Sequence, residues 1–290
     1  MRKFNKFLMF KEVDLAYKIS MKNIFTLLLL LTALFSNAQR TMFTSQNNYV
    51  APVGPPALVT EGLVLNLDAG NTTSYPGSGT TWTDLSEKGN HGTLYNSVTY
   101  NSSNQGSLVF NGYENGQGPN PYVLLPTNTD FDFGSGDFTV ELWIYMTPSN
   151  EHPNFLSINV DEATNYAAIR LSAYQGNLGV LHSNNNSSWL SGPGSGTSFT
   201  LNAWKHIVLS RTSGQATIYL DGISKLTYSL PASLMSNKLN VIGTITPNFG
   251  NPGFFNLSGK IALTRIYKGR GLTASEALTH FDLTKSRFGL

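Results

Sequence analysis

The chain has 290 residues, with 19 Lys and Arg, 17 Asp and Glu, and no cysteine. The absence of cysteine excludes a disulfide scaffold and thiolate metal sites. The formal charge of +2 includes a basic N-terminal region, and no Lys or Arg cluster follows it, so the electrostatic footprint of a nucleic-acid-binding protein is missing.

The apolar run Ile24–Phe35 follows Lys22 and ends in Ser36-Asn37-Ala38. Its length fits the roughly 7–15 apolar residues of a secretory signal peptide and falls short of the roughly 20 that a membrane-spanning helix needs. We therefore predict a signal peptide over residues 1–38, no transmembrane anchor, and a protein that is secreted or held at the cell surface. Met21 is an alternative start, because Met21-Lys22-Asn23 would begin a normal signal sequence.

Residues 39–60 combine proline and glycine with polar residues, a composition that favours an extended tether. A folded domain over residues 61–290 is expected after it. Leu63–Leu67 is its first predicted strand, and Asp68–Asn71 turns the chain because Asp, Gly and Asn tolerate the backbone angles of turns.

Short β-patterned runs alternate with turn residues through the rest of the domain. From Phe138 to Tyr145 apolar side chains alternate strictly with Thr139, Glu141, Trp143 and Tyr145, which predicts a strand. Gly214 and Asp221-Gly222 mark turns on either side of Ala216–Leu220, which should pair with both of its neighbours in an antiparallel meander. The other predicted strands are Ser107–Phe110, Tyr122–Leu125, Tyr166–Ala173, Gly179–His182, Trp204–Arg211, Ile223–Tyr228, Leu239–Ile245 and Lys260–Tyr267.

One helix is predicted, over Ala274–Phe281, because Thr273 and Glu276 have the spacing of a capping box. A succession of short strands closed by one helix predicts an all-β fold in which two antiparallel sheets pack face to face.

Several segments of the predicted domain carry a family resemblance. They are Leu63–Asn71, Ser74–Gly77, Trp82–Ser86, Gly89–Leu94, Gly136–Trp143, Trp204–Leu209, Ala216–Gly222 and Gly259–Tyr267. Their order and spacing resemble bacterial laminin-G-like jelly-roll domains of the concanavalin A-like lectin/glucanase superfamily. The resemblance covers residues 61–290 and implies a jelly-roll sandwich. It implies no single ligand, since that superfamily includes carbohydrate binders, calcium-dependent adhesion modules and glycoside hydrolases.

A glycosidase needs two carboxyl groups roughly 5–9.5 Å apart. Glu141 has no acidic residue two positions away, so the Glu-x-Asp signature of the superfamily's hydrolases is absent. Asp130 and Asp132 have that spacing but precede a Gly-rich loop, and the adjacent Asp161 and Glu162 would point to opposite faces of a strand. The pattern favours a non-enzymatic module, with a glycoside hydrolase or lyase as the alternative.

Sugar binding needs exposed aromatic faces together with amide or hydroxyl groups. Trp189 lies in the polar loop Ser183–Leu190, and Tyr166 and Tyr174 flank a nearby predicted strand, so these three aromatics are the candidate platforms. Core packing is the open alternative for each of them. The expected partner is a glycan on a cell surface or in the extracellular matrix. A protein-binding adhesion or structural module is the alternative, and an exposed apolar patch would favour it.

The resemblance also implies a possible calcium ion on the rim of the sandwich, where Asp and Asn oxygens suit a hard cation. Asp68 and Asp84 are the nearest candidate ligands, with turn capping by the Asp side chain as the alternative. His91, His152 and His280 lack the partner spacing of a metal site. The sequence does not indicate an oligomeric state.

Overall fold

This computed structural model describes Asn23, Thr26 and residues 57–112, 120–148, 152–174, 176–190, 197–198, 200–247 and 255–290. The rest of the predicted signal peptide, and residues 39–56 of the predicted tether, lie outside the described residues. The chain divides into two units, Met1–Pro55 and Pro56–Leu290, and the strands below belong to the second. Within the described part, no helix is long and apolar enough to span a membrane.

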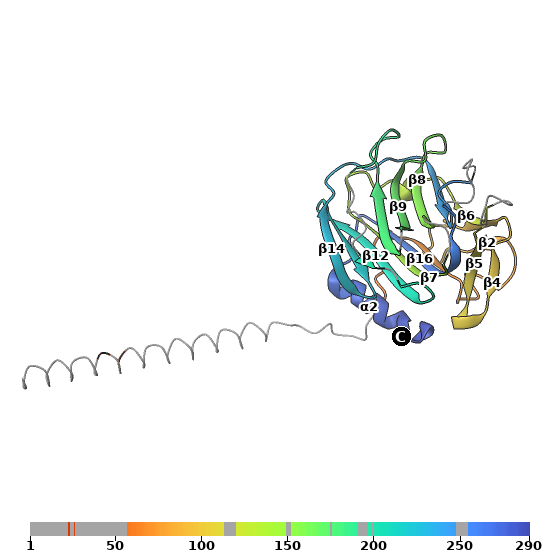
Figure 1. Ribbon diagram of the computed structural model, residues 1–290, viewed down its shortest axis with the longest axis horizontal. Coiled ribbons are helices and arrows are strands. Elements are labelled where there is room, and N and C mark those ends of the chain that lie inside the picture. The colour runs from red at the N-terminus through yellow and green to blue at the C-terminus, as the bar shows by residue number, and fades with distance from the viewer. Residues whose placement is uncertain are drawn as a thin grey trace, which may run out of the picture. The chain divides into compact units, whose positions relative to one another are not determined.

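Two antiparallel sheets of eight strands each form the described fold (Figure 1), which confirms the predicted all-β sandwich. The first sheet contains β14 (Ile223–Ser229), β13 (Gln215–Leu220), β12 (Trp204–Thr212), β7 (Phe138–Met146), β16 (Ser258–Lys268), β5 (Ser107–Asn111) and β4 (Thr99–Asn101) in that order, with β1 (Leu63–Asp68) also paired to β16. The second contains β11 (Thr197–Ser198), β10 (Asn177–His182), β9 (Ala167–Tyr174), β8 (Asn154–Val160), β15 (Leu239–Ile242), β6 (Tyr122–Leu125), β3 (Gly92–Tyr95) and β2 (Thr81–Trp82).

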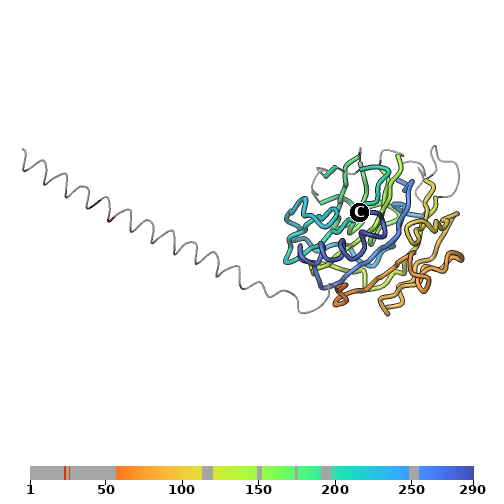
Figure 2. Tube along the Cα trace, turned by 90° about the horizontal axis from the view of Figure 1, so that it is seen from below, coloured from red at the N-terminus to blue at the C-terminus, as the bar shows by residue number. Residues whose placement is uncertain are grey.

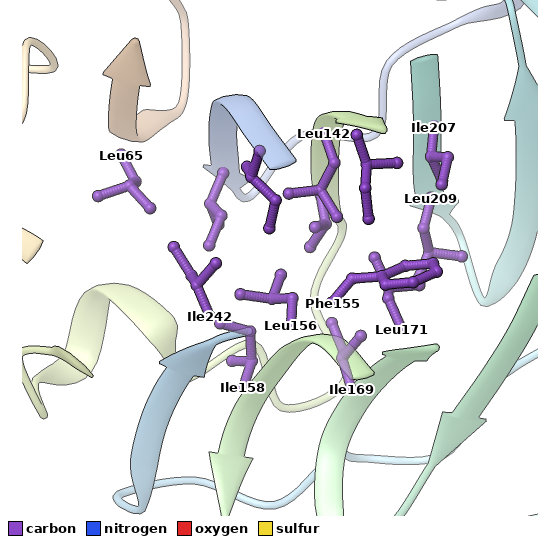
Figure 3. Packing of buried hydrophobic residues seen from close by; sticks show 14 of the residues in the cluster. Leu65, Leu142, Phe155, Leu156, Ile158, Ile169, Leu171, Ile207, Leu209 and Ile242 are labelled. Atoms are coloured by element: carbon purple, nitrogen blue, oxygen red, sulfur yellow. The ribbon is translucent and has the colours of Figure 1, made fainter. Parts of the chain in front are cut away.

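The core lies between the two inner sheet faces. Leu142 on β7 and Ile207 and Leu209 on β12 point from the first sheet toward Leu156 on β8 and Ile169 on β9 of the second (Figure 3). All five side chains are buried. The predicted alternation along β7 is therefore confirmed, and so is the meander, since β13 pairs with both β12 and β14.

Several strands of the second sheet differ from the sequence prediction, which did not include β2, β3 or β11. β15 ends at Ile242 rather than at Ile245, because Gly243 has a φ of 91° and lies against the ring of Phe110, where a Cβ would clash. β8 was not predicted. Every residue of β8 is buried, including Asn154, Ser157 and Asn159, so the strand shows no polar and apolar alternation.

The helix α2 (Ala274–Thr284) and the short 3₁₀ turn η4 (Lys285–Phe288) cover the outer face of the first sheet (Figure 2). The predicted capping box of Thr273 and Glu276 is present. Trp143 on β7 stacks on Phe288 with ring centroids 4.1 Å apart and donates a hydrogen bond to Oγ1 of Thr284. The face of β7 opposite the core is therefore buried as well.

A buried carboxylate joins this helix to the sheet. Oε1 of Glu141 accepts hydrogen bonds from Nε2 of His206 at 3.0 Å and from Nη1 of Arg265 at 2.9 Å. Oε2 accepts from Nδ1 of His280 on α2 at 2.9 Å, while Nε2 of His280 accepts from the backbone N–H of Val59. The Glu141, His206 and His280 side chains have no exposed surface. One ionised group thereby connects three strands, the helix and the segment that enters the domain.

The protonation of Glu141 follows from these contacts. Burial alone would raise the pKa of Glu141. The charge of Arg265 and the hydrogen bonds from His206 and His280 outweigh burial and hold that pKa well below its usual value of 4.5. Glu141 is therefore ionised in the folded protein at neutral pH.

Glu141→Gln should lower the free energy of unfolding by about 3–5 kcal/mol, because it leaves buried Arg265 without its counter-charge. Urea denaturation at pH 7 measures the change. Asp282→Asn is the matched control: it removes an exposed i,i+3 ion pair with Lys285, which is worth about 0.5 kcal/mol or less. Equal small losses in both variants would contradict the role given to Glu141.

Acid should weaken the wild type more steeply than it weakens Glu141→Gln. A carboxyl whose folded pKa is depressed contributes stability above its unfolded pKa, here the usual 4.5, and this contribution is lost as the pH falls through the folded pKa. Unfolding free energies measured between pH 7 and pH 3 should therefore converge for the two proteins. Parallel curves would show that Glu141 is not the group responsible.

Candidate functional site

A surface pocket of about 340 Å³ lies at one end of the second sheet. It combines apolar side chains with charged and amide groups. The residues that line it are Thr127, Val160, Asp161, Glu162, Ala163, Asn237, Lys238 and Leu239. Three chain segments contribute: the end of β8 with the turn after it, the approach to β15, and the loop that follows β6.

Asp161 organises the turn between β8 and β9. Its Oδ1 accepts hydrogen bonds from the backbone N–H groups of Ala163 and Thr164, at 3.0 and 3.1 Å, and its Oδ2 pairs with Nζ of Lys238 at 2.8 Å. The hydrogen bond from Lys238 lowers the pKa of Asp161 below its usual value, with a further contribution from Thr164, although burial opposes the shift. The backbone O of Tyr166 accepts from the N–H of Asp161, which closes the turn.

Two buried amides hold the other wall of the pocket. Oδ1 of Asn159 accepts from the N–H of Lys238 at 3.0 Å, and its Nδ2 donates to the carbonyl of Phe131 at 2.7 Å. Asn240 in turn accepts from the N–H of Asn159 and donates to the carbonyl of Pro126. Because both amides bond at both ends, the backbone around Lys238 is fixed.

The loop Ser183–Leu190 follows β10 and is organised from within. Oδ1 of Asn185 accepts four hydrogen bonds, from the N–H and hydroxyl groups of Ser187 and Ser188, at 2.9 to 3.3 Å. Buried Ser183 donates to the carbonyl of Ser188 at 2.6 Å. Residues 184–188 remain exposed, so the loop presents amide and hydroxyl groups on a preformed backbone.

Trp189, at the end of this loop, contacts Tyr166 at the end of the β8–β9 turn. Their ring centroids are 5.0 Å apart, with ring planes inclined by 54°. Both side chains are half-buried. Trp189 packs on the outer face of the second sheet, against a buried cluster of Tyr122, Val160, Ala167 and Val241 that is separate from the core. Val160 also lines the pocket, so the aromatic pair and the pocket share one wall.

The structure thus brings together two of the three predicted platforms. Tyr174 is the last residue of β9, whereas Tyr166 immediately precedes the first, so Tyr174 belongs to the far end of that strand. Its side chain lies outside the described residues. Trp143 and Trp204 pack beneath the C-terminal segment, with Phe288 between the sheet and solvent, and offer no binding surface.

The two candidate calcium ligands act as turn caps. Oδ1 of Asp68 accepts from the N–H of Gly70 and from Nη1 of Arg287. Asp84 accepts four hydrogen bonds, from the N–H groups of Asn66, Ser86 and Asn90 and from the Ser86 hydroxyl. These hydrogen bonds support the turn-capping alternative for both residues. Calcium binding at Asp68 and Asp84 stays a prediction. Among the described residues, no group of three or more His, Asp or Glu could hold a metal ion.

The acidic residues weighed for catalysis are also engaged. Asp130 accepts from Nδ2 of Asn90 at 2.9 Å in the 3₁₀ turn η3 (Thr129–Phe131), and Asp132 accepts from the N–H of Asn237 at 2.8 Å. Asp161 is paired with Lys238, and Glu141 is enclosed beneath α2. Each of these four carboxylates therefore has a structural partner, while the exposed Glu162 lines the pocket.

Sequence reasoning missed Asp161, Asn237 and Lys238 as parts of one site. The spacing of Asp161 and Thr164 is a local signal, since Asp side chains cap the N–H groups two and three residues later. No comparable signal links Asp161 to Lys238, because their approach depends on the pairing of β8 with β15.

Comparison with family models identifies the family to which the chain belongs. A laminin-G model described as the concanavalin A-like lectin/glucanases superfamily matches residues 115–277, and the chain belongs to this family. The predicted resemblance and jelly-roll fold are confirmed. Comparison with curated proteins gave no significant match.

Solved structures share the fold at low sequence identity. The binding domain of Paraclostridial Mosquitocidal Protein 1 is 18% identical, with a TM-score of 0.60 over 77% of this chain and 52% of that one. The binding domain of botulinum neurotoxin DC, in complex with rat synaptotagmin II, is 14% identical, with a TM-score of 0.59 over 78% and 52%. A botulinum neurotoxin type C structure, from work on its entry through two ganglioside molecules, is 15% identical, with a TM-score of 0.57 over 78% and 52%. The chain spans about half the length of these proteins.

Iodide quenching of fluorescence should report mainly on Trp189, because Trp82 and Trp143 are fully buried and Trp204 is 7% exposed. Asn185→Ala should increase quenching, since the loop loses the acceptor of four hydrogen bonds. Asn186→Ala, an exposed change in the same loop, is the control and should leave quenching unchanged. Loss of the quenchable signal in Trp189→Phe would verify the assignment; an unchanged signal would contradict it.

Proposed function

We propose that this protein is an exported, non-enzymatic module that binds carbohydrate on a cell surface or in the extracellular matrix. The aromatic pair of Trp189 and Tyr166, beside a pocket with charged and amide groups, is the observation that carries the proposal.

The chemistry of the pair and the pocket suits a saccharide. A sugar ring has an apolar C–H face, which stacks on aromatic rings, and hydroxyl groups, which bond to amides and carboxylates. Trp189 and Tyr166 supply the rings, while Asn237, Lys238 and the exposed Ser187 and Ser188 hydroxyls supply polar groups. Because the turns that carry them are fixed by internal hydrogen bonds, binding would order few additional groups.

The same geometry favours binding over hydrolysis. A hydrolase needs one carboxyl free to protonate the leaving group and a second carboxylate free to attack or to activate water. At the pocket, Asp161 is committed to Lys238 and to its own turn. The carboxylates of Asp130 and Asp132 accept hydrogen bonds from Asn90 and Asn237.

The comparisons support a recognition role without identifying a ligand. The family description names lectins beside glucanases. One similar solved structure is a complex with rat synaptotagmin II, and another is from work on interaction with two ganglioside molecules. Export rests on the predicted signal peptide of residues 1–38.

A protein-binding adhesion module is the second candidate, and one surface favours it. Large apolar side chains are exposed where β14 begins and along the C-terminal segment: Ile223 is 58% exposed and Leu278 is 44% exposed. Gly222, which precedes Ile223, lies against Leu278, so Ile223 and Leu278 belong to one region. This region is on the first sheet's side of the sandwich, away from the aromatic pair.

A glycan-array screen of the purified protein, with and without calcium, tests the proposal. Trp189→Ala should lower affinity for any glycan that binds by at least about tenfold, since a central aromatic at a binding site contributes about 2 kcal/mol or more. Comparing the screens with and without calcium tests whether the calcium ion predicted at Asp68 and Asp84 contributes to glycan binding.

Leu278→Ser is the control for that screen, because it changes the exposed region on α2 and should leave glycan binding intact. Silence across the array in both conditions would overturn the carbohydrate proposal. Binding that Leu278→Ser abolishes and Trp189→Ala spares would relocate the site to the helix.

A further inference from the structure

Arg170, on β9, is a buried cation without an acidic partner in the described part of the chain. Its side chain is 7% exposed. The salt bridges found among these residues involve Arg265, Arg270 and Arg287 but not Arg170. Burial lowers its pKa to about 10, so the guanidinium is still charged at neutral pH. A buried charge usually has an ionic partner, because desolvation costs several kcal/mol.

The protein holds one edge and one face of this guanidinium. Nε donates to Oδ1 of Asn154 at 3.1 Å, and Asn154 is fixed in turn because its Nδ2 donates to Oγ of Ser157 and to the carbonyl of Thr244. The guanidinium carbon lies 4.6 Å from the ring centroid of Phe255. Arg170 is therefore oriented by its neighbours.

The opposite edge is left without a partner. Nη1 and Nη2 make no hydrogen bond to any residue that the structure describes. Neither atom is among the fully buried, unpaired polar atoms of that part of the chain, so both keep some contact with solvent. These two nitrogens form the fork that binds a carboxylate or sulfate through two parallel hydrogen bonds.

Arg170 shares a sheet face with the cluster on which Trp189 packs. It is the cross-strand partner of Ser157, and Ser157 is the partner of Val241. Val241 belongs to the outer cluster on which Trp189 packs. Along the chain, Arg170 lies four residues from Tyr166, or about 13 Å at the rise of a strand.

We propose that Arg170 binds the anionic group of an acidic saccharide, a carboxylate or a sulfate, while a neighbouring sugar ring stacks on Trp189. This inference rests on the proposed function and deepens it by naming the ligand class. A neutral glycan would leave the guanidinium fork unpaired, so the site should discriminate against it.

The test compares the binding of glucose, glucuronic acid and glucose 6-sulfate to the purified protein by NMR titration. The acidic sugars should bind and glucose should bind at least about tenfold more weakly. The two acids distinguish carboxylate from sulfate. Arg170→Gln should abolish the preference for the acids, and Arg170→Lys should restore only part of it, because lysine keeps the charge but lacks the fork. Lys225→Gln removes an exposed charge from β14 and should change nothing.

Thermal unfolding separates loss of binding from loss of folding in the Arg170→Gln variant. Without ligand, Arg170→Gln should stay folded, because it loses the hydrogen bond to Asn154 but no ion pair among the described residues. Glucuronic acid or glucose 6-sulfate should raise the melting temperature of the wild type but not that of Arg170→Gln. Glycan binding that Trp189→Ala removes and Arg170→Gln spares would overturn the role of Arg170 and leave the proposed function standing. No binding of any glycan, together with no stabilisation by either acid, would overturn both.

Discussion

The ionised Glu141 beneath the C-terminal helix determines which faces of this sandwich are available. A carboxylate inside a protein is tolerated only when cations and hydrogen bonds compensate for its lost hydration. Arg265, His206 and His280 do so, and His280 can reach Glu141 only if α2 lies across the first sheet. The outer face of that sheet is consequently committed to folding. On the second sheet the half-buried Trp189 packs on the outer face, and its neighbour Tyr166 also packs against the core.

The candidate site is rigid for the same kind of reason. Its side chains sit on turns, which are normally the mobile parts of a β-sandwich. Asp161, Asn185 and Asn159 each use a side-chain oxygen to accept backbone N–H groups, so the turns carry hydrogen bonds of their own. Such turns tolerate sequence variation around them while keeping the backbone in place. Ligand specificity can then reside in a few exposed side chains.

Local patterns explain which parts of this structure the sequence could predict. The alternation along β7 and the pairing of Thr273 with Glu276 involve neighbours in the chain, and both were predicted. The contacts of Glu141 with His206 and His280 span 65 and 139 residues, so no local pattern contains them. Trp189 and Tyr166 were singled out separately by composition. Their contact, and the pocket that Asp161 and Lys238 form beside them, depend on strand pairing that sequence spacing does not encode.

Glu141 and Arg170 show opposite solutions to one physical problem. Both are buried ionised groups on strands, and both would be costly in isolation. Glu141 accepts hydrogen bonds from three side chains, which satisfies it completely within the fold and makes it a stabilising element. Among the described residues, Arg170 has one hydrogen bond and one aromatic face, which orient it without neutralising it. A fold that retains an oriented but unpaired cation carries a cost in stability, and binding of an anion is the process that would offset that cost.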